Sequence, residues 1–165
     1  MTNTNETENL EILIVEDREE NRNAAREAFA KIENVTLDFA TNYEEAIEKM
    51  PQKPYAAAII DLEFPRTEGA TPEKLGDKLI EETKKEYLPA VILTGGYFHG
   101  QKKQARIFFD AESVYQESGQ STADKTDPCS WTDAYNTFSR GNLEMVVKAR
   151  GRRLKVKSLN KEAEK

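Results

Sequence analysis

Hydrophobic residues are concentrated in short runs along this chain, and longer polar or amphipathic segments separate these runs. Three of the runs are uninterrupted, as in strands that are covered on both faces of a parallel sheet. They are residues 12–15, 56–60 and 90–93. Residues 35–40 instead alternate between apolar and polar side chains, which is the spacing of a half-exposed strand. The pattern therefore predicts four strands.

The segments between the strands have helical spacing. Residues 18–32 place apolar side chains such as Ala25 and Phe29 on one side of a predicted helix. Further helices are expected over residues 42–50, 71–87, 101–117 and 130–138. Strand and helix thus alternate four times, which favours a parallel sheet with helices on both faces. Residues 119–124 are the only plausible position for a fifth strand, although their composition is polar.

Capping patterns predict where three of the helices begin. Asn42 and Ser130 each stand three positions before an acidic residue, as in a capping box. Thr71 is expected to cap the helix over residues 71–87, because Pro72 then takes the first helical position, where proline is favoured. These signals fix three predicted helix starts.

Length and composition predict one domain with polar ends. The 165 residues suffice for a single core. Residues 1–9 are almost entirely polar and are expected to form a disordered tail, so the domain should cover residues 10–150. Residues 151–165 are predicted to be a basic, polar tail. The cations of this region could bind an acidic partner or nucleic acid, but a solvated helix end is the simpler interpretation.

The charge, the cysteine content and the lack of long apolar runs narrow the functional classes. A formal net charge of -6 argues against general nucleic-acid affinity. Cys129 is the only cysteine, which excludes a disulfide within the chain and fits a reducing, cytoplasmic location. No apolar run approaches the length of a membrane span, so no membrane partner is expected.

Polar side chains with useful chemistry follow three of the four predicted strands. Glu16 and Asp17 come directly after the first strand, Asp61 after the third, and Thr94 ends the fourth. Ligands of doubly wound sheets bind beyond the carboxyl ends of the strands, so these residues should converge at one edge.

Clustered carboxylates repel one another unless a cation joins them, and oxygen-only ligands suit Mg²⁺. One alternative is that Glu16 and Asp17 merely favour the N-terminus of the following helix. Because Asp61 and Thr94 stand at matching strand ends, a Mg²⁺ site explains more of the pattern.

These residues resemble those of a known family. The stretches "ILIVED", "AAAIIDLEFP" and "VILTGG" are similar to the first, third and fourth strands of the receiver domain of bacterial and archaeal response regulators. The resemblance covers residues 10–98. It implies a five-stranded parallel sheet of flavodoxin-like order 2-1-3-4-5, with helices on both faces.

The resemblance also implies a role for several residues. Asp61 would accept a phosphoryl group from a histidine kinase or phosphotransfer protein, and Glu16 and Asp17 would be acids of the Mg²⁺ site. The backbone carbonyl of Glu63 would bind the metal, and Thr94 would be the switch hydroxyl. A carboxylate is a competent phosphoryl acceptor once a metal holds its charge.

Two further residues complete the implied site. Gly95 follows the switch hydroxyl, where a larger side chain would crowd the phosphoryl group, although an ordinary turn would also explain this glycine. Lys125 would pair with the phosphoryl oxygens, as the family's lysine at the end of the fifth strand does. It stands farther from Thr94 than is usual in the family, and Pro128 does not follow it directly. Thr122 occupies the position where the family tends to place an aromatic residue.

Three functions remain open at this stage. The favoured one is a single-domain response regulator of a phosphorelay, a phosphoacceptor rather than a turnover enzyme, that changes its binding to an unidentified downstream protein. An inactive receiver-like interaction module would keep the fold without the switch. A haloacid-dehalogenase-like phosphatase also uses an aspartate at a strand end. The sequence "DLE" and the long segment before Asp61 do not match that pattern.

Overall fold

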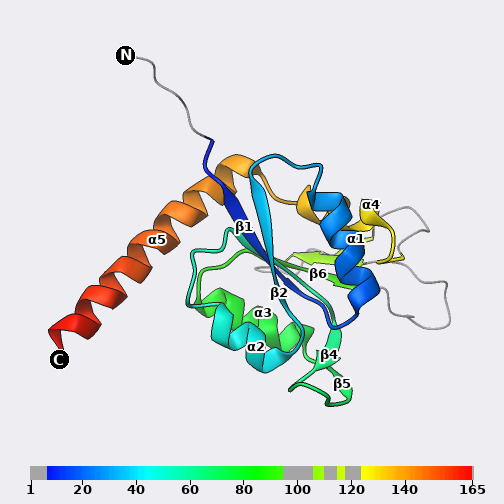
Figure 1. Cartoon of the computed structure of the whole chain (residues 1–165), viewed down its shortest axis with the longest axis horizontal. Coiled ribbons are helices and arrows are strands. Elements are labelled where there is room, and N and C mark those ends of the chain that lie inside the picture. Colours follow the sequence, from blue (N-terminus) through cyan, green and yellow to red (C-terminus); the bar gives the residue numbers. More distant parts are fainter. Residues whose placement is uncertain (1–6, 95–105, 110–114, 118–123, 165) are drawn as a thin grey trace.

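Four parallel strands form the centre of the molecule in the computed structural model, which describes residues 7–94, 106–109, 115–117 and 124–164 (Figure 1). The central order is β2-β1-β3-β6. The strands are β1 (Leu10–Val15), β2 (Val35–Ala40), β3 (Ala57–Ile60) and β6 (Ala90–Thr94). This arrangement confirms the predicted α/β class and the order of the first four predicted strands.

Helices cover both faces of the sheet. They are α1 (Glu19–Phe29), α2 (Tyr43–Lys49), α3 (Gly76–Lys85), α4 (Pro128–Tyr135) and α5 (Arg140–Ala163). Side chains alternate across a strand, so Ile12 and Ile14 of β1 join one apolar cluster with α1, α4 and the start of α5. Leu13 and Val15 join a second cluster with α2 and α3 on the opposite face. The two clusters hold the strand ends in fixed positions.

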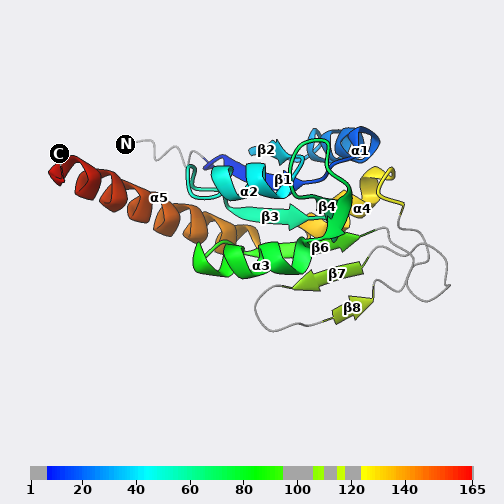
Figure 2. The same ribbon diagram turned by 90° about the horizontal axis from the view of Figure 1, so that it is seen from below.

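The sheet continues past β6 with antiparallel strands. β7 (Arg106–Phe109) pairs antiparallel with β6, and β8 (Tyr115–Glu117) pairs antiparallel with β7, as Figure 2 shows. The helix predicted over residues 101–117 is therefore wrong at both strands. Its sequence contains Ile-Phe-Phe at 107–109, and β-branched and aromatic residues favour strands. The fifth parallel strand expected at 119–124 lies outside the described residues except for Asp124, and β7 holds the place beside β6.

A short hairpin follows β3 at the carboxyl edge of the sheet. It consists of β4 (Glu63–Pro65) and β5 (Pro72–Lys74), paired antiparallel. The helix start predicted at Thr71 is wrong, because Pro72 opens β5 and α3 begins only at Gly76. Proline is tolerated in an exposed two-stranded ribbon because its missing N–H need not pair.

The C-terminal helices also differ from the expected boundaries. α4 begins at Pro128 rather than Ser130, because the side chain of Asp127 accepts a hydrogen bond from the Cys129 backbone N–H at 2.9 Å. α5 runs to Ala163, so the segment expected to be a tail is helical. Within the described residues, no helix is both long and apolar enough to cross a membrane.

Candidate functional site

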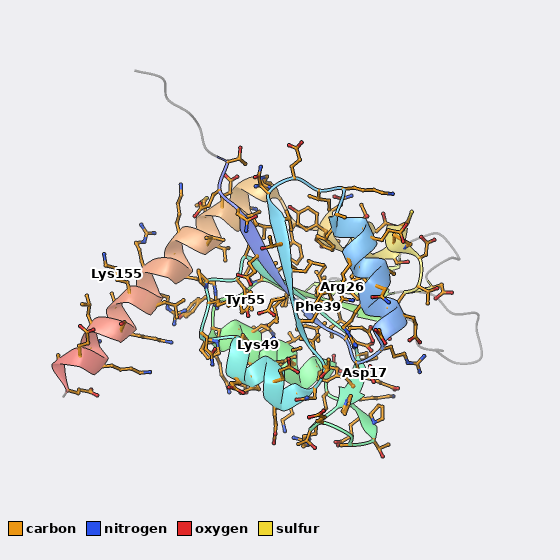
Figure 3. The ribbon with its side chains drawn as sticks, viewed as in Figure 1. Asp17, Arg26, Phe39, Lys49, Tyr55 and Lys155 are labelled. Atoms are coloured by element: carbon orange, nitrogen blue, oxygen red, sulfur yellow. The ribbon has the colours of Figure 1, made fainter. Side chains whose placement is uncertain are left out.

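Three carboxylates meet at the carboxyl edge of the central strands. Ligand oxygens of Glu16, Asp17 and Asp61 all lie within 4.8 Å of one another. Glu16 is fully buried, and Asp61 is only 9% exposed. Asp17 is partly buried and lies just after the end of β1 (Figure 3). The predicted convergence of these three acids is therefore found in the structure.

Strand register brings Glu16 and Asp61 together. Val15 of β1 pairs with Ile60 of β3, so the residues that follow them emerge side by side. The Asp61 backbone N–H donates to the carbonyl of Val15 at 2.9 Å, which extends the ladder by one bond. Thr94 ends β6, the strand on the other side of β3, and is 4% exposed. Backbone pairing thus places Glu16, Asp61 and Thr94 at the same edge of the sheet.

The ammonium of Lys125 lies between two of the carboxylates. Its Nζ is 2.6 Å from Oε2 of Glu16 and 2.8 Å from Oδ1 of Asp61. The Lys125 side chain is only 8% exposed, so these contacts are shielded from bulk water. Lys125 precedes α4 and does not belong to a described strand, yet it reaches the site that the resemblance assigned to it.

The start of α4 holds the backbone around Lys125. The indole Nε1 of Trp131 donates to the carbonyl of Lys125 at 2.8 Å, and Oγ of Ser130 donates to the carbonyl of Asp124 at 3.1 Å. Trp131 is 1% exposed and belongs to the apolar cluster under α1. The buried helix therefore positions the lysine. In the sequence, the only sign of this arrangement is that the chain has a single tryptophan, and no role was predicted for it.

Burial and neighbouring charges alter how the site titrates. Burial, together with the charge of Glu16, raises the pKa of Asp61 to about 6, although Lys125 opposes the change. Burial and the charge of Glu16 also raise the pKa of Asp17 above its ordinary value. Burial alone would lower the pKa of Lys125, but the Asp61 and Glu16 carboxylates outweigh it and raise that pKa. The site thus disfavours three simultaneous negative charges.

The backbone of the site is held by close contacts. The backbone N–H of Arg18 donates to Oε1 of Glu16 at 3.1 Å, and Nη1 of Arg22 donates to the Glu16 carbonyl at the same distance. A Cβ on Gly76 would lie 2.6 Å from the Asp61 carbonyl oxygen. Gly76 lets α3 start directly against the Asp61 backbone. The pair Leu-Gly at the helix start was a signal that the sequence interpretation missed.

The oxygen donors fit a divalent cation. Three ionised carboxylates and one ammonium leave a charge of about -2 in the cluster, which one divalent ion would balance. Clustered carboxylate oxygens suit Mg²⁺, which takes few protein ligands and keeps several waters. Glu63 is exposed at the start of β4. Gly95 lies outside the described residues, as does Thr122.

Comparison with known proteins agrees with this arrangement. Residues 12–113 match the response regulator receiver domain family, a match that spans more than half of the 165 residues. The chain belongs to this family, which acts in two-component signalling with histidine kinases or phosphotransfer proteins.

Two further comparisons add no detail. No curated protein matches the chain. The chain is similar to a solved fusion that contains the trimeric coiled coil of yeast Spc42, with 16% sequence identity and a TM-score of 0.45. That comparison covers 95% of this chain and 93% of the other. A TM-score this low supports no conclusion about fold or function.

Proposed function

We propose that this protein is a response regulator that accepts a phosphoryl group on Asp61 from a histidine kinase or phosphotransfer protein. The observation that carries the proposal is the Lys125 ammonium 2.8 Å from Oδ1 of Asp61, inside a cluster of three carboxylates. This combination supplies an acceptor and a cation, together with oxygen ligands for Mg²⁺. Membership of the receiver family makes the same assignment the natural one.

The proposed reaction transfers a phosphoryl group from a histidine of the donor protein to the Asp61 carboxylate of this protein. An ionised carboxylate oxygen of Asp61 forms a bond to phosphorus while the phosphorus–nitrogen bond of the donor phosphohistidine breaks. The imidazole nitrogen keeps the electron pair and takes up a proton, and Asp61 becomes an acyl phosphate. Because little covalent chemistry is left to the protein, its contribution is to position the groups and to neutralise charge.

Each residue of the site has a proposed part in this transfer. Glu16, Asp17 and Asp61, with the backbone carbonyl of Glu63, would hold Mg²⁺, which supplies charge neutralisation at the phosphoryl oxygens when it is bound. Lys125 would exchange its contact with the Asp61 carboxylate for one with a phosphoryl oxygen.

The remaining two residues would act on the product. The hydroxyl of Thr94, at the end of β6, would donate to a phosphoryl oxygen, and Gly95 would leave room for the group. The rearrangement would then change how the protein binds its downstream target.

Binding of beryllofluoride, a phosphoryl mimic, tests the proposal. We expect isothermal titration calorimetry to show one site per chain, with binding that requires Mg²⁺. Acetyl phosphate should also label the wild-type protein covalently. Asp61→Asn should lose both the mimic and the label, whereas Asp77→Asn, at an exposed position in α3, should keep both. Absence of mimic binding to the folded wild-type protein with Mg²⁺ present would contradict the proposal.

One observation favours a second function, that of an inactive receiver-like interaction module. β7 pairs antiparallel with β6 where a parallel strand was expected, so a switch that depends on a fifth parallel strand would be altered. If the protein is such a module, the wild-type protein and Asp61→Asn should bind the partner with the same affinity. The haloacid-dehalogenase-like phosphatase has no comparable support, because the chain belongs to the receiver family.

A further inference from the structure

The last helix extends beyond the body of the domain. Leu143, Val147 and Arg150 of α5 are buried, and Arg153 donates a hydrogen bond to the Glu86 carbonyl at 3.3 Å. Residues 155–164 are all exposed, and Figures 1 and 2 show this part of α5 projecting from the domain. Helices in proteins gain most of their stability from packing against other elements. A partner that packs against this exposed segment would therefore stabilise it.

An apolar stripe runs along the exposed face of α5. Its positions alternate in spacing between four and three residues, which is the repeat of a two-helix coiled-coil seam. They are Met145, Ala149, Arg152, Val156, Leu159 and Ala163. Each of the six is exposed, including Met145 at 69% and Val156 and Leu159 at 56%. Part of this seam lines an open groove, which Ala149, Arg152, Arg153, Val156 and Lys157 form.

The charges beside the stripe are all positive from Met145 to Asn160, and acids stand only at its two ends, at Glu144 and Glu162. Between residues 145 and 160 every charged side chain is a cation, although the whole chain carries -6. Lys148 and Lys155 lie on one edge of the stripe and Arg153 lies on the other, at the positions that set pairing in coiled coils. Lys155, which is labelled in Figure 3, is exposed. A second copy of α5 would bring like charges together along this segment, so its pairing is disfavoured.

The shape of the stripe also argues against a membrane or nucleic acid. A membrane-surface helix needs a wide apolar face with bulky residues, whereas this seam is narrow, has no aromatic residue and contains Arg152. Nucleic acid would neutralise the cations but would leave Val156 and Leu159 uncovered. A helix with apolar residues at the same spacing and with acidic flanks would cover the apolar stripe and also pair with the cations beside it.

We propose that α5 docks an acidic amphipathic helix of a partner protein, with Met145, Ala149, Val156, Leu159 and Ala163 forming the seam. Arg152 would pair with an acidic side chain of that helix inside the seam, which would fix the register. Flanking cations would select acidic partners and speed their association. This surface lies on α5 and does not depend on the chemistry at Asp61.

A designed probe tests the surface on the full-length protein. The probe is a labelled peptide of about three heptads, with leucine at the seam positions and glutamate at the flanks. We expect saturable one-to-one binding by fluorescence anisotropy. Val156→Gln with Leu159→Gln should weaken it by about tenfold or more, because these residues would be central anchors. The control Ser158→Gln, an exposed position off the seam, should bind as the wild type does.

Each alternative occupant of the α5 surface predicts a different experimental result. A scrambled acidic peptide, a duplex DNA and vesicles with anionic lipid should each bind more weakly than the probe. Equal or tighter binding of any of them would overturn the proposal. So would a concentration-dependent dimer in sedimentation that Val156→Gln with Leu159→Gln abolishes, since a second copy would then occupy the seam. Circular dichroism of both variants checks that α5 remains helical.

Discussion

The Nζ atom of Lys125 lies 2.8 Å from Oδ1 of Asp61 and also contacts Glu16, at 2.6 Å from Oε2. One buried cation therefore serves two buried carboxylates that come from different strands. Asp17 completes the acidic cluster without a described ion pair to Lys125. The cluster keeps an excess of negative charge, so its stability depends on both the lysine and any added cation.

Removal of the Lys125 ammonium should show how far the stability of the cluster depends on it. Lys125→Met leaves Glu16 and Asp61 buried without their cation, so the free energy of unfolding at neutral pH should fall by roughly 3 kcal/mol. Mg²⁺ should then stabilise the variant more than the wild type, because the cluster carries one more negative charge. Urea unfolding followed by the fluorescence of Trp131, the single tryptophan, measures both effects.

Lys84→Met is the matched control for this experiment. Lys84 forms an exposed ion pair with Glu81 at 3.3 Å, so its loss should cost less than about 0.5 kcal/mol. An equal loss of stability in both variants, or a Mg²⁺ effect no larger in Lys125→Met than in the wild type, would show that Lys125 does not neutralise the cluster.

The site could be predicted from sequence because a parallel sheet converts linear order into position. Asp61 follows an apolar run that had to be a buried strand, and the same holds for Glu16 and Asp17. Once these strands are neighbours, their carboxyl ends coincide and the acids must meet. Lys125 lacked such a signal, because it precedes a helix and is placed by Trp131 through tertiary packing.

Other features depended on contacts that are distant in sequence. Residues 107–109 form a short apolar run that suits either a helix or a strand, and pairing with β6 decided the outcome. Pro72 is equally compatible with a helix start and with an exposed ribbon, so the hairpin was missed. The basic and polar composition of residues 151–165 suggested a tail, although most of this segment continues the helix that Leu143 and Val147 anchor.

The ionisation of Asp61 should make the metal-free protein less stable as the pH rises. The folded state raises the pKa of Asp61 from 3.8 to about 6, so it binds this proton more tightly than the unfolded state does. The resulting stability is complete below about pH 4 and is lost as the pH rises through about 6. Asp61→Asn has no carboxyl group to ionise at this position. Its free energy of unfolding should therefore rise by on the order of 1–3 kcal/mol relative to the wild type across this range.

Urea unfolding in the presence of a chelator, at several pH values from about 4 to 7, checks this prediction. The quantity to follow is the difference between the free energies of unfolding of Asp61→Asn and the wild type, which should grow with pH. Asp77→Asn, at an exposed position in the first turn of α3, should give a difference that does not grow with pH. A difference for Asp61→Asn that stays constant or shrinks with pH would refute the proposed protonation of Asp61.

Gly76 should be intolerant of a side chain. A Cβ there would lie 2.6 Å from the Asp61 carbonyl oxygen and 2.8 Å from Cα of Leu62, and neither backbone atom can rotate away. Gly76→Ala should lower the free energy of unfolding by about 1–3 kcal/mol and weaken Mg²⁺ binding, because the acceptor backbone must move. Gly151→Ala in α5, where a Cβ would meet no atom within 4 Å apart from the helix's own backbone, should instead stabilise by up to about 1 kcal/mol. Calorimetric titration of Mg²⁺ with unchanged affinity in Gly76→Ala would show that the contact does not position the site.

Arg150 ties α5 to the ends of two helices on the opposite face of the sheet. Its Nη2 donates to the Met50 carbonyl at 2.9 Å and its Nη1 donates to the Glu86 carbonyl, at the residues that end α2 and α3. The residue is 4% exposed, so Arg150→Met would fill similar space but remove both hydrogen bonds. The Met50 carbonyl would lose its Arg150 donor, and the Glu86 carbonyl would keep only the donor from Arg153, at 3.3 Å. We expect the free energy of unfolding to fall by about 2–4 kcal/mol.

Hydrogen exchange distinguishes a local effect of losing the two Arg150 hydrogen bonds from a general loss of packing. In Arg150→Met, amides in the last turns of α2 and α3 should exchange faster, while those of α1, which Arg150 does not contact, should keep their protection relative to the global stability. Arg152→Met, two residues away and exposed, should alter neither the exchange nor the free energy of unfolding by more than about 0.5 kcal/mol. Uniform acceleration across all helices of the described domain would mean that Arg150 supports the core as a whole and does not cap these two helices.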